Sequence, residues 1–248
     1  MSKICAIIEA RTSSTRLPGK VLLKIKKKTV LEYLINQLKK VEKIDQIIIA
    51  TTLNKQDDEI IRIAKKLKVN FYRGDEDNVL QRVIKAAKSF RVNIIVRITS
   101  DCPLVDLELI DQFIEIYLKN DFDIVTNAHH RSYPDGMDIE VIKSKSLIKS
   151  YRYATNKYLK EHTTLSIYKH KNLFKICNII APHSQFFPKL GLTLDEYKDF
   201  VLIKKIISYI IDKKKNAYSC KEIIDLLDRK GWKNINKSVK RVKHKYLI

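Results

Sequence analysis

The chain has 248 residues, of which 49 are Lys or Arg and 28 are Asp or Glu, so its formal net charge is +21. This length suits one medium-sized domain, and a content of 45% hydrophobic and 31% charged residues excludes wholesale disorder. No apolar run reaches the roughly 18 residues that a membrane helix needs, and four scattered cysteines predict neither a zinc site nor disulfides, so we expect a cytoplasmic protein outside the membrane.

Short apolar runs alternate with amphipathic segments in the first half of the chain. The apolar runs occupy residues 4–9, 46–50, 93–99 and 122–126. Such runs are typical of parallel strands that are covered on both faces. Apolar residues recur at helical spacing over residues 31–38, 60–67, 79–87 and 109–117. We therefore predict an α/β fold with helices on both faces of its sheet.

This alternation breaks after Asn127, and later elements are less regular. A turn-rich piece leads to an alternating strand at 137–142, and the next predicted elements are a helix at 144–159, a strand at 174–180 and helices at 195–211 and 219–229. Neither an internal repeat nor a Gly/Ser linker is present. We predict one domain over residues 1–212, with an insertion at about 128–190, and a basic helical tail over 213–248.

The loop Glu9–Lys20, EARTSSTRLPGK, follows the first predicted strand. Ligands of open α/β sheets bind at the carboxyl ends of strands, so this loop lies where a ligand is expected. It combines Arg11, Arg16 and Lys20 with small hydroxyl side chains and backbone N–H groups, which suits a triphosphate. It matches neither GxxxxGK[ST] nor GxGxxG. A solvated basic turn is the alternative interpretation.

A second candidate is the segment Arg97–Pro103, directly after an apolar run. Asp101 is well placed to hold Mg²⁺, which usually takes one or two carboxylates plus phosphate oxygens. The alternative is that Asp101 merely caps a helix beginning near Asp106. Cys102 is expected to be structural, because a neighbouring carboxylate raises a thiol pKa and makes it a poorer nucleophile.

Other polar residues could complete this site. Asp138 and Glu140 point to one face of a predicted strand, and Asp195 ends a short apolar segment. Singly, each is better explained as a turn or cap residue, but jointly with Asp101 they could bind metal and substrate. His162, between a predicted helix and a predicted apolar strand, is by itself best explained as a polar surface residue.

The basic composition suggests a polyanionic ligand, and nucleic acid is one candidate. However, 38 of the 49 basic residues are Lys and only 11 are Arg, the residue that reads bases bidentately. Residues 201–248 alone hold 14 basic and four acidic residues. Binding of nucleic acid or an anionic surface through residues 213–215 and 233–245 is therefore the less favoured alternative.

A family resemblance rests on the first loop, where Ala10-Arg11 and Arg16–Lys20 resemble the signature of cytidylyltransferases that make CMP-activated 3-deoxy-2-keto sugar acids, such as Kdo and nonulosonic acids. The pattern is most similar to the spore coat polysaccharide biosynthesis protein F family. It continues through residues 49–52, 57–58, 73–74, 77–82, 96–104, 136–140, 161–163 and 192–195, with Asp199 beyond. The resemblance covers nearly the whole chain, and the first loop and Asp101-Cys102-Pro103 are its most specific parts.

The resemblance implies a three-layer α/β/α nucleotide-diphospho-sugar transferase fold with a mixed sheet, and a homodimer formed through the inserted segment. It implies cytidylyl transfer from CTP, assisted by Mg²⁺, to a sugar acid, with release of pyrophosphate. Another nucleotide or a phosphorylated small molecule as acceptor is the alternative within this fold.

The resemblance also implies roles for individual residues. Arg11, Arg16 and Lys20 hold the triphosphate and the leaving pyrophosphate. The nucleotide site further contains Ala10, Ser13, Ser14, Thr51, Thr52, Arg73 and Arg82. Asp101 and Asp195 bind the metal. The acceptor pocket is lined by Arg97, Asp138, Glu140 and His162.

Overall fold

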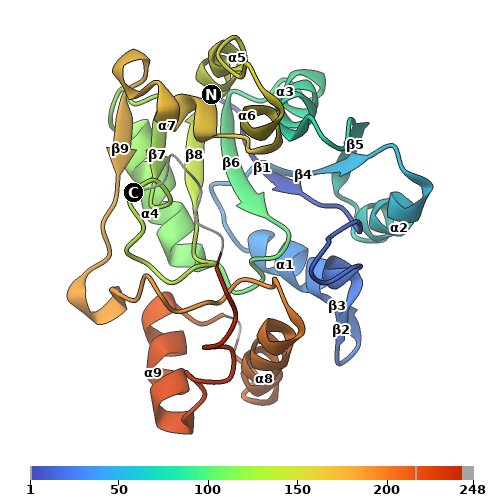
Figure 1. Ribbon diagram of the computed structural model, residues 1–248, viewed down its shortest axis with the longest axis vertical. Coiled ribbons are helices and arrows are strands. Elements are labelled where there is room, and N and C mark those ends of the chain that lie inside the picture. The colour runs from blue at the N-terminus through green and yellow to red at the C-terminus, as the bar shows by residue number, and fades with distance from the viewer. Residues whose placement is uncertain (1, 216, 242–248) are drawn as a thin grey trace.

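A seven-stranded sheet forms the centre of the molecule (Figure 1). The computed structural model describes residues 2–215 and 217–241. The strands lie in the order β5-β4-β1-β6-β8-β7-β9, with the bounds β1 Ile4–Glu9, β4 Gln46–Thr52, β5 Asn70–Gly74, β6 Ile94–Thr99, β7 Ile124–Thr126, β8 Glu140–Lys143 and β9 Ile176–Asn178. A separate small sheet pairs β2, Lys24–Ile25, with β3, Lys28–Thr29.

The sheet is mixed, as predicted. Strands β5, β4, β1 and β6 are mutually parallel, whereas β8 runs antiparallel to both of its neighbours, β6 and β7. Strand β9 is parallel to β7 at the edge. In the β1–β6 pair Glu9 lies opposite Thr99, so the carboxyl ends of the two central strands stop side by side. The loops that follow both strands therefore begin at one place on the sheet edge.

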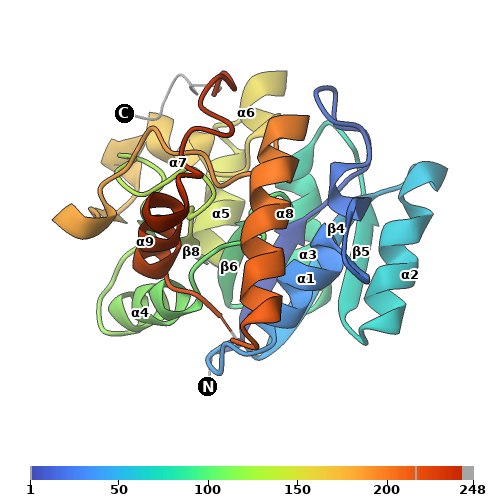
Figure 2. The same ribbon diagram turned by 90° about the horizontal axis from the view of Figure 1, so that it is seen from below.

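Helices cover both faces of the sheet and give the predicted three layers (Figures 1 and 2). One face packs against α1 Val30–Leu38, α2 Asp58–Lys66 and α4 Leu107–Leu118, and the same apolar cluster extends to α8 Tyr197–Asp212 and α9 Cys220–Lys230 at the lower end of Figure 1. The other packs against α3 Val79–Ser89, α5 Ser144–Tyr151, α6 Lys157–Glu161 and α7 Leu165–Lys169. Within β1, Ile4, Ala6 and Ile8 enter the first apolar cluster, and Cys5 and Ile7 enter the second. This explains why a strand buried on both faces is apolar throughout.

Within residues 2–215 and 217–241, four short 3-10 helices occupy connections between these elements. They are η1 Lys20–Leu22, η2 Lys55–Asp57, η3 Lys171–Leu173 and η4 His183–Gln185. At the start of α4, the Asp106 carboxylate accepts the backbone N–H groups of Glu108 at 2.9 Å and Leu109 at 3.3 Å. Asp106 is thus the N-cap of α4, which removes the alternative that Asp101 serves this purpose.

Several predicted elements differ from the structure. The strand expected at 137–142 begins only at Glu140, and the helix expected at 144–159 is interrupted between α5 and α6. The interruption ends at Asn156, whose side chain accepts the Leu159 N–H at 2.9 Å and starts a new helix. The apolar run after His162 is helix α7 rather than a strand, since a short apolar run is compatible with either form.

Strand β5 was absent from the sequence prediction. Four of its five residues are only partly buried, because β5 is the edge strand next to β4, so it lacks the apolar run that marks β1, β4 and β6. Edge strands are covered on fewer sides than central ones, and their sequences carry a weaker periodic signal.

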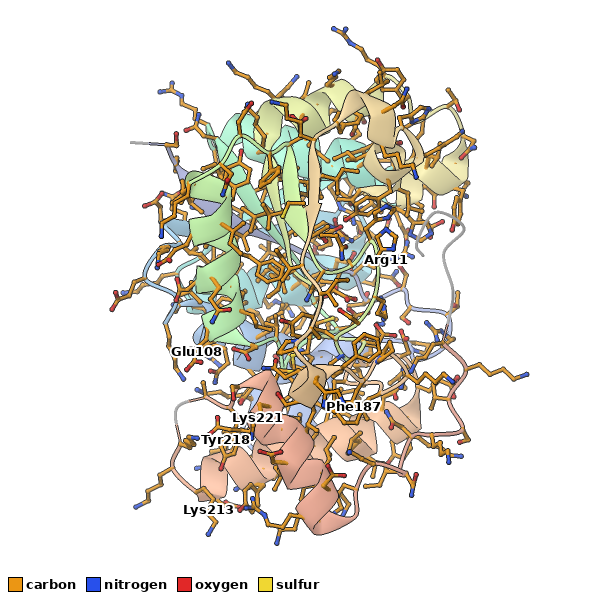
Figure 3. All side chains as sticks on the ribbon, turned by 90° about the vertical axis from the view of Figure 1, so that its left-hand side faces the viewer. Arg11, Glu108, Phe187, Lys213, Tyr218 and Lys221 are labelled. Carbon is orange, nitrogen blue, oxygen red and sulfur yellow. The ribbon has the colours of Figure 1, made fainter. Side chains whose placement is uncertain are left out.

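The C-terminal region packs on the sheet domain. Apolar side chains of α9, such as Ile223 and Leu227, belong to the same buried cluster as those of β1. Figure 3 shows Lys213 and Lys221 at the end of the molecule formed by α8 and α9, apart from Arg11. Residues 242–248 of the expected tail lie outside the described residues, and the domain boundary at 212 remains a prediction. Among the described helices, none has both the length and the apolar character needed to cross a bilayer.

Candidate active site

A cavity of about 550 Å³ opens at the carboxyl ends of β1 and β6. Its lining comes from six parts of the chain: the end of β1 with the loop after it, the start of α3, the end of β6 with the loop after it, the region from residue 128 to β8, the region from α6 to α7, and the segment at 193–195. These parts are far apart in sequence and meet because parallel strands end at one sheet edge. The cavity is therefore the candidate site.

The loop after β1 is held by one buried carboxylate. Asp57, which has no exposed surface, accepts the backbone N–H of Thr12 at 2.8 Å and its hydroxyl at 2.7 Å. The same carboxylate accepts the hydroxyl of Thr52 at the end of β4. Farther along, the Gly19 N–H donates to the Thr12 carbonyl at 2.8 Å, and Gly19 adopts a left-handed φ of 67°. The loop thus folds back on itself, and Lys20 enters the cavity.

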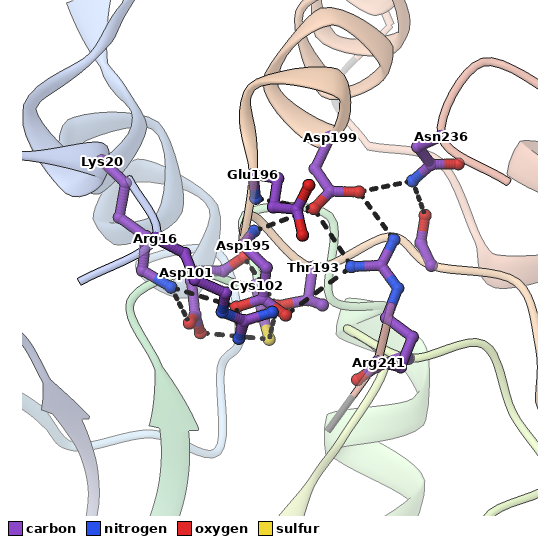
Figure 4. A network of polar contacts seen from close by, with 12 residues as sticks. Arg16, Lys20, Asp101, Cys102, Thr193, Asp195, Glu196, Asp199, Asn236 and Arg241 are labelled. Carbon is purple, nitrogen blue, oxygen red and sulfur yellow. Dashed lines mark hydrogen bonds and ion pairs between the residues drawn. The ribbon is translucent and has the colours of Figure 1, made fainter. Parts of the chain in front are cut away.

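Lys20 lies between the two predicted metal-binding carboxylates (Figure 4). Its Nζ is 2.6 Å from Asp101 Oδ2 and 3.4 Å from Asp195 Oδ1. Arg16 contacts the same Asp195 oxygen at 2.8 Å. Asp101 and Asp195, which are 94 residues apart in sequence, therefore converge on one cationic group. Two carboxylates that share one ammonium lie close enough to face one bound cation.

The pKa values in this group follow from burial opposed by charge. Burial disfavours the charged form of Lys20, but Asp101 and Asp195 outweigh it and raise the Lys20 pKa. Burial also acts against ionised Asp101, yet the adjacent Lys20 ammonium lowers the pKa of that carboxyl. For Asp195, burial raises the pKa, and the nearby Asp101 adds to this effect against Lys20 and Arg16. A cation at this position stabilises both ionised carboxylates.

Arg11 is held more loosely than the other loop cations. Its guanidinium lies 3.6 Å from Glu76 and 3.6 Å from Glu161, and a third of the side chain is exposed. Such long, exposed ion pairs are weak. A triphosphate entering the cavity would meet Arg11 without breaking a strong contact.

A second polar network forms the inner wall of the cavity. Arg97 donates to both carboxylate oxygens of Glu9, at 2.7 and 2.8 Å, and to Glu140 at 2.5 Å. Tyr168 donates to Glu140, and Thr163 donates to Glu9 at 2.5 Å. Burial opposes ionisation of Glu9, but Arg97 lowers the Glu9 pKa. Because Arg97 is already occupied by two carboxylates, it fixes this wall rather than presenting a free cation.

Next to this wall, Arg131 pairs with Asp135 and with Asp138, the latter at 3.0 Å. Burial, together with the nearby negative charges of Asp135 and Glu140, raises the pKa of Asp138 to about 7 despite Arg131. His162 also lines the cavity, and its ring centroid lies 4.7 Å from that of Tyr158. This region therefore presents both positively and negatively charged hydrogen-bonding groups to an acceptor substrate.

Most of the predicted site residues meet in this cavity. Its lining contains Ala10, Arg11, Ser14, Arg16, Lys20, Arg82, Arg97, Asp101, Asp138, Glu140, His162 and Asp195. Arg82 is 2% exposed, and its guanidinium donates to the carbonyl of Glu76 at 3.1 Å. The roles expected for these residues remain predictions.

Four predicted nucleotide-binding residues do not belong to the lining: Ser13, Thr51, Thr52 and Arg73. The Ser13 hydroxyl donates to Glu76, and Thr52 donates to Asp57. Arg73 donates to the Thr52 carbonyl at 2.8 Å and contacts Asp58 at 2.9 Å. These contacts stabilise the loops around the cavity, so any contact of Ser13, Thr52 or Arg73 with the nucleotide would require these side chains to rearrange. The Thr51 hydroxyl is buried and has no hydrogen-bond partner among the described residues.

Sequence reasoning did not single out Arg131, or the role of Glu9 as the partner of Arg97. Arg131 and its partner Asp135 lie in a turn-rich segment that precedes the predicted strand with Asp138 and Glu140. A four-residue spacing of opposite charges is the one local signal for the pair. Glu9 ends an apolar run, and a charge at the end of a central strand is itself a signal of a site.

Asp101 and Asp195 are compatible with a divalent cation. Within the described part of the chain, no group of three or more His, Cys, Asp or Glu side chains could hold a metal by itself. Mg²⁺ does not need such a group, because it is commonly bound by one or two carboxylates together with substrate phosphates and water. The two converging carboxylates suit that kind of site.

The family called Cytidylyltransferase matches residues 5–237 of the chain. A Methanocaldococcus jannaschii protein described as uncharacterized is 40% identical over 242 residues, which are 96% of each chain. The spore coat polysaccharide biosynthesis protein SpsF of Bacillus subtilis is 32% identical over 236 residues, which are 92% of this chain and 95% of that protein.

Solved structures show the same architecture. The structure of a cytidylyltransferase from Leptospira borgpetersenii is 30% identical, with a TM-score of 0.89 over 98% of this chain and 100% of that one. A CMP:2-keto-3-deoxy-manno-octonic acid synthetase complexed with CTP is 12% identical, with a TM-score of 0.63 over 84% of this chain and 99% of that one. The latter likeness concerns the fold.

Proposed function

The chain belongs to the cytidylyltransferase family and is a CTP-dependent nucleotidyltransferase, and from this we propose that its acceptor is a sugar acid of the 3-deoxy-2-keto or nonulosonic type. The product would be the CMP derivative, used for a surface polysaccharide or glycan. The similarity to a protein of spore coat polysaccharide biosynthesis supports this acceptor class.

The observation that carries the proposal is the convergence of Lys20, Asp101 and Asp195 beside the cationic loop after β1. The loop cations Arg11 and Arg16 supply positive charge next to them. A triphosphate needs this arrangement, because its charge must be neutralised while its α-phosphorus stays accessible. We place the triphosphate at this end of the cavity.

The acceptor then occupies the end lined by Arg131, Asp138 and His162. Carboxylates such as Asp138 accept hydrogen bonds from sugar hydroxyl groups, and Arg131, which is paired with Asp135 and Asp138, holds these carboxylates at the wall of the cavity. The cavity of about 550 Å³ lies within the range of small-molecule sites.

The proposed reaction is an in-line displacement at the α-phosphorus of CTP. The acceptor hydroxyl oxygen forms a new bond to this phosphorus, and the bond to the oxygen that bridges to the β-phosphorus breaks. Pyrophosphate leaves with that oxygen and its electron pair. We assign the proton of the acceptor hydroxyl to Asp138, because Asp138 lines the acceptor end of the cavity; burial with Asp135 and Glu140 raises its pKa to about 7, which suits proton transfer near neutral pH. Lys20 and Arg16 stabilise the charge that develops on the leaving pyrophosphate.

We propose that Asp101 and Asp195 hold Mg²⁺ when CTP is bound. In this position the ion would neutralise phosphate charge and orient the triphosphate. The residues of this chain perform the remaining work: they position CTP, hold the acceptor and accept its proton. We further propose a cytoplasmic homodimer formed through residues 128–190, which light scattering of the purified protein would test.

The function is tested by following pyrophosphate release with CTP, Mg²⁺ and a panel of eight- and nine-carbon keto-sugar acids. We expect release with at least one of them, and none with the corresponding phosphorylated neutral sugars. Calorimetric titration with CTP, UTP, GTP and ATP provides a reading that needs no acceptor. Turnover with a phosphorylated alcohol instead of any sugar acid would contradict the proposed acceptor class.

A further inference from the structure

The segment after α9, residues 233–241, lies against the loop that carries Asp195; we call it the C-terminal strap (Figure 4). Two of its side chains, Asn236 and Arg241, reach the first turn of α8. Asn236 is 3% exposed and also donates to the Gly191 carbonyl at 2.9 Å. The strap is thus bound to both ends of the segment 191–199.

The contact point on α8 is Asp199, a carboxylate with no exposed surface. One of its oxygens, Oδ2, accepts the backbone N–H groups of Asp195 at 3.1 Å and Glu196 at 2.9 Å. Arg241 donates to both Asp199 oxygens, with Nη1 at 3.1 Å and Nη2 at 2.6 Å. Asn236 donates to Oδ1 at 2.7 Å. Asp199 is therefore a joint between the strap and the Asp195 backbone.

Arg241 also approaches Asp195 itself. Its Nη1 lies 3.6 Å from Asp195 Oδ2, whereas Arg16 and Lys20 contact the other oxygen, Oδ1. Asp195 lines the cavity, but Arg241 does not. The two oxygens of Asp195 thus contact different cations. Oδ1 contacts Arg16 and Lys20, which line the cavity, and Oδ2 faces Arg241 of the strap.

We propose that Arg241 is a positioning residue, which fixes Asp195 at the active site through its bidentate contact with Asp199. This inference rests on the proposed role of Asp195 in the reaction. A planar guanidinium that donates to two oxygens of one carboxylate defines the orientation of that carboxylate, which a single ammonium does not. The orientation of Asp199 in turn decides where its Oδ2 holds the Asp195 backbone.

The absence of a side chain at Gly191 leaves room for the Arg241 guanidinium. A Cβ at residue 191 would overlap the Arg241 guanidinium, so the strap can reach Asp199 only beside a glycine. Gly191 also lies opposite Asp135 in a parallel bridge, which joins this segment to the acceptor side of the cavity. Replacement of Gly191 by Ala displaces the guanidinium while every charged group is kept.

The first test uses Arg241→Gln, with Arg229→Gln as its matched control. Arg229 is an exposed arginine in the last turn of α9, so the same chemical change is made away from the site. We expect amide exchange over residues 192–200 to become about 10-fold faster in Arg241→Gln, while β1 stays protected. We also expect kcat to fall about 10- to 100-fold, with a much smaller change of KM for CTP. Arg229→Gln should leave both unchanged.

Two further variants, Gly191→Ala and Arg241→Lys, test the same contact in different ways. Gly191→Ala should show the same local exchange and loss of kcat, and it carries the test if Arg241→Gln does not fold. Arg241→Lys should recover less than half of the lost kcat, because it restores charge without the bidentate geometry. A lower melting temperature with unchanged local exchange and kcat, in either Arg241→Gln or Gly191→Ala, would overturn the inference.

The exchange measurement needs neither CTP nor acceptor. If the wild-type protein turned over no sugar acid, the proposed acceptor would be wrong, whereas the exchange over residues 192–200 would still decide whether Arg241 holds the Asp195 loop. If turnover is found and the exchange is unaffected by Arg241→Gln, the positioning role is wrong and the proposed function stands.

Discussion

Replacement of Lys20 by Met removes the one ammonium shared by Asp101 and Asp195 and keeps the volume of the side chain. Two losses should follow from different causes. The ligand-free protein loses the compensation of two largely buried carboxylates. The enzyme loses a cation that contacts the triphosphate in the proposed reaction. These effects can be separated, because the first is a property of folding and the second of the reaction.

The effect on stability can be worked out from the contacts. Removing one partner of a buried ion pair costs about 3–5 kcal/mol. Here the Nζ distances are 2.6 and 3.4 Å, but Arg16 stays 2.8 Å from Asp195. We therefore expect a loss of about 2–3 kcal/mol at pH 7, because water reaches these side chains and Arg16 keeps its contact. For a chain of this size, the melting temperature should fall by roughly 5–10 °C.

The stability lost in Lys20→Met should depend on pH, and the pKa shift of Asp101 gives the direction. Burial opposes the ionisation of Asp101, and Lys20 more than offsets it, so the pKa of Asp101 lies below its ordinary value of 3.8. A depressed carboxyl pKa stabilises the fold above the unfolded pKa, and this contribution is lost as pH falls through the folded pKa. The stability difference between wild type and Lys20→Met should therefore be larger at pH 7 than below pH 3.8, where Asp101 becomes protonated in the folded wild-type protein.

The effect on activity follows from the loss of one preorganised charge. Such a loss typically costs about 10²–10³ in kcat. The assay is pyrophosphate release with CTP and Mg²⁺, with calorimetric CTP affinity as the reading that needs no acceptor. Lys24→Met is the matched control, since Lys24 is an exposed lysine four residues away. In the double variant Lys20→Met with Asp101→Asn, stability should largely return and activity should not.

The reasoning would be refuted by a Lys20→Met protein that keeps kcat within about threefold of wild type, since a preorganised charge is worth far more. A stability loss of the same size in Lys24→Met would show that the two carboxylates are not its cause.

Three further predictions concern other parts of the site. Asp57→Ala should lower the free energy of unfolding by about 2–3 kcal/mol in a denaturant titration and weaken CTP affinity, because Thr12 loses the acceptor of its N–H and hydroxyl. An unchanged CTP affinity would show that Asp57 does not hold the loop in the shape that binds CTP. Asp138 binds its proton more tightly in the folded protein, with a pKa of about 7 against an ordinary value of 3.8, so the free energy of unfolding should decline as pH rises from about 4 to 7. Asp138→Asn should remove this decline and lower kcat. A variant that keeps the decline would show that Asp138 is not its cause. Burial and Asp101 raise the Cys102 pKa well above its ordinary value, so a thiol reagent should leave native Cys102 unmodified and react first with the partly exposed Cys177; rapid native labelling of Cys102 would contradict its burial.

The central strands could be predicted because burial on both faces leaves a local mark. The runs that became β1, β4 and β6 are mostly apolar, which is typical of strands covered by two helical layers. The edge strand β5 and the helix α7 lacked a decisive local signal. In α7, Leu165 and Ile167 are both buried against the same face of the sheet. Their spacing of two residues is also typical of a strand, so the sequence pattern did not distinguish the two forms.

Residues that line the cavity could be proposed from the sequence where a strand end coincided with a motif, as at Arg11, Lys20 and Asp101. A motif does not tell which of these groups already have partners. Arg97 illustrates this limit: the residue expected to bind the acceptor is held by Glu9 and Glu140, which come from two other strands. Such a network depends on the register between β1, β6 and β8, and the register is a property of the folded sheet.

The sequence by itself determined the α/β class, the cationic loop after β1 and the carboxylate after β6, because strand burial and strand-end chemistry are local. It also contained the +21 charge, whose meaning it left open. Only the tertiary structure placed Asp195 beside Asp101 and brought Arg241 to Asp199. These two pairs are separated by 94 and 42 positions in the sequence, and chain segments so distant meet only when the helices pack on the sheet.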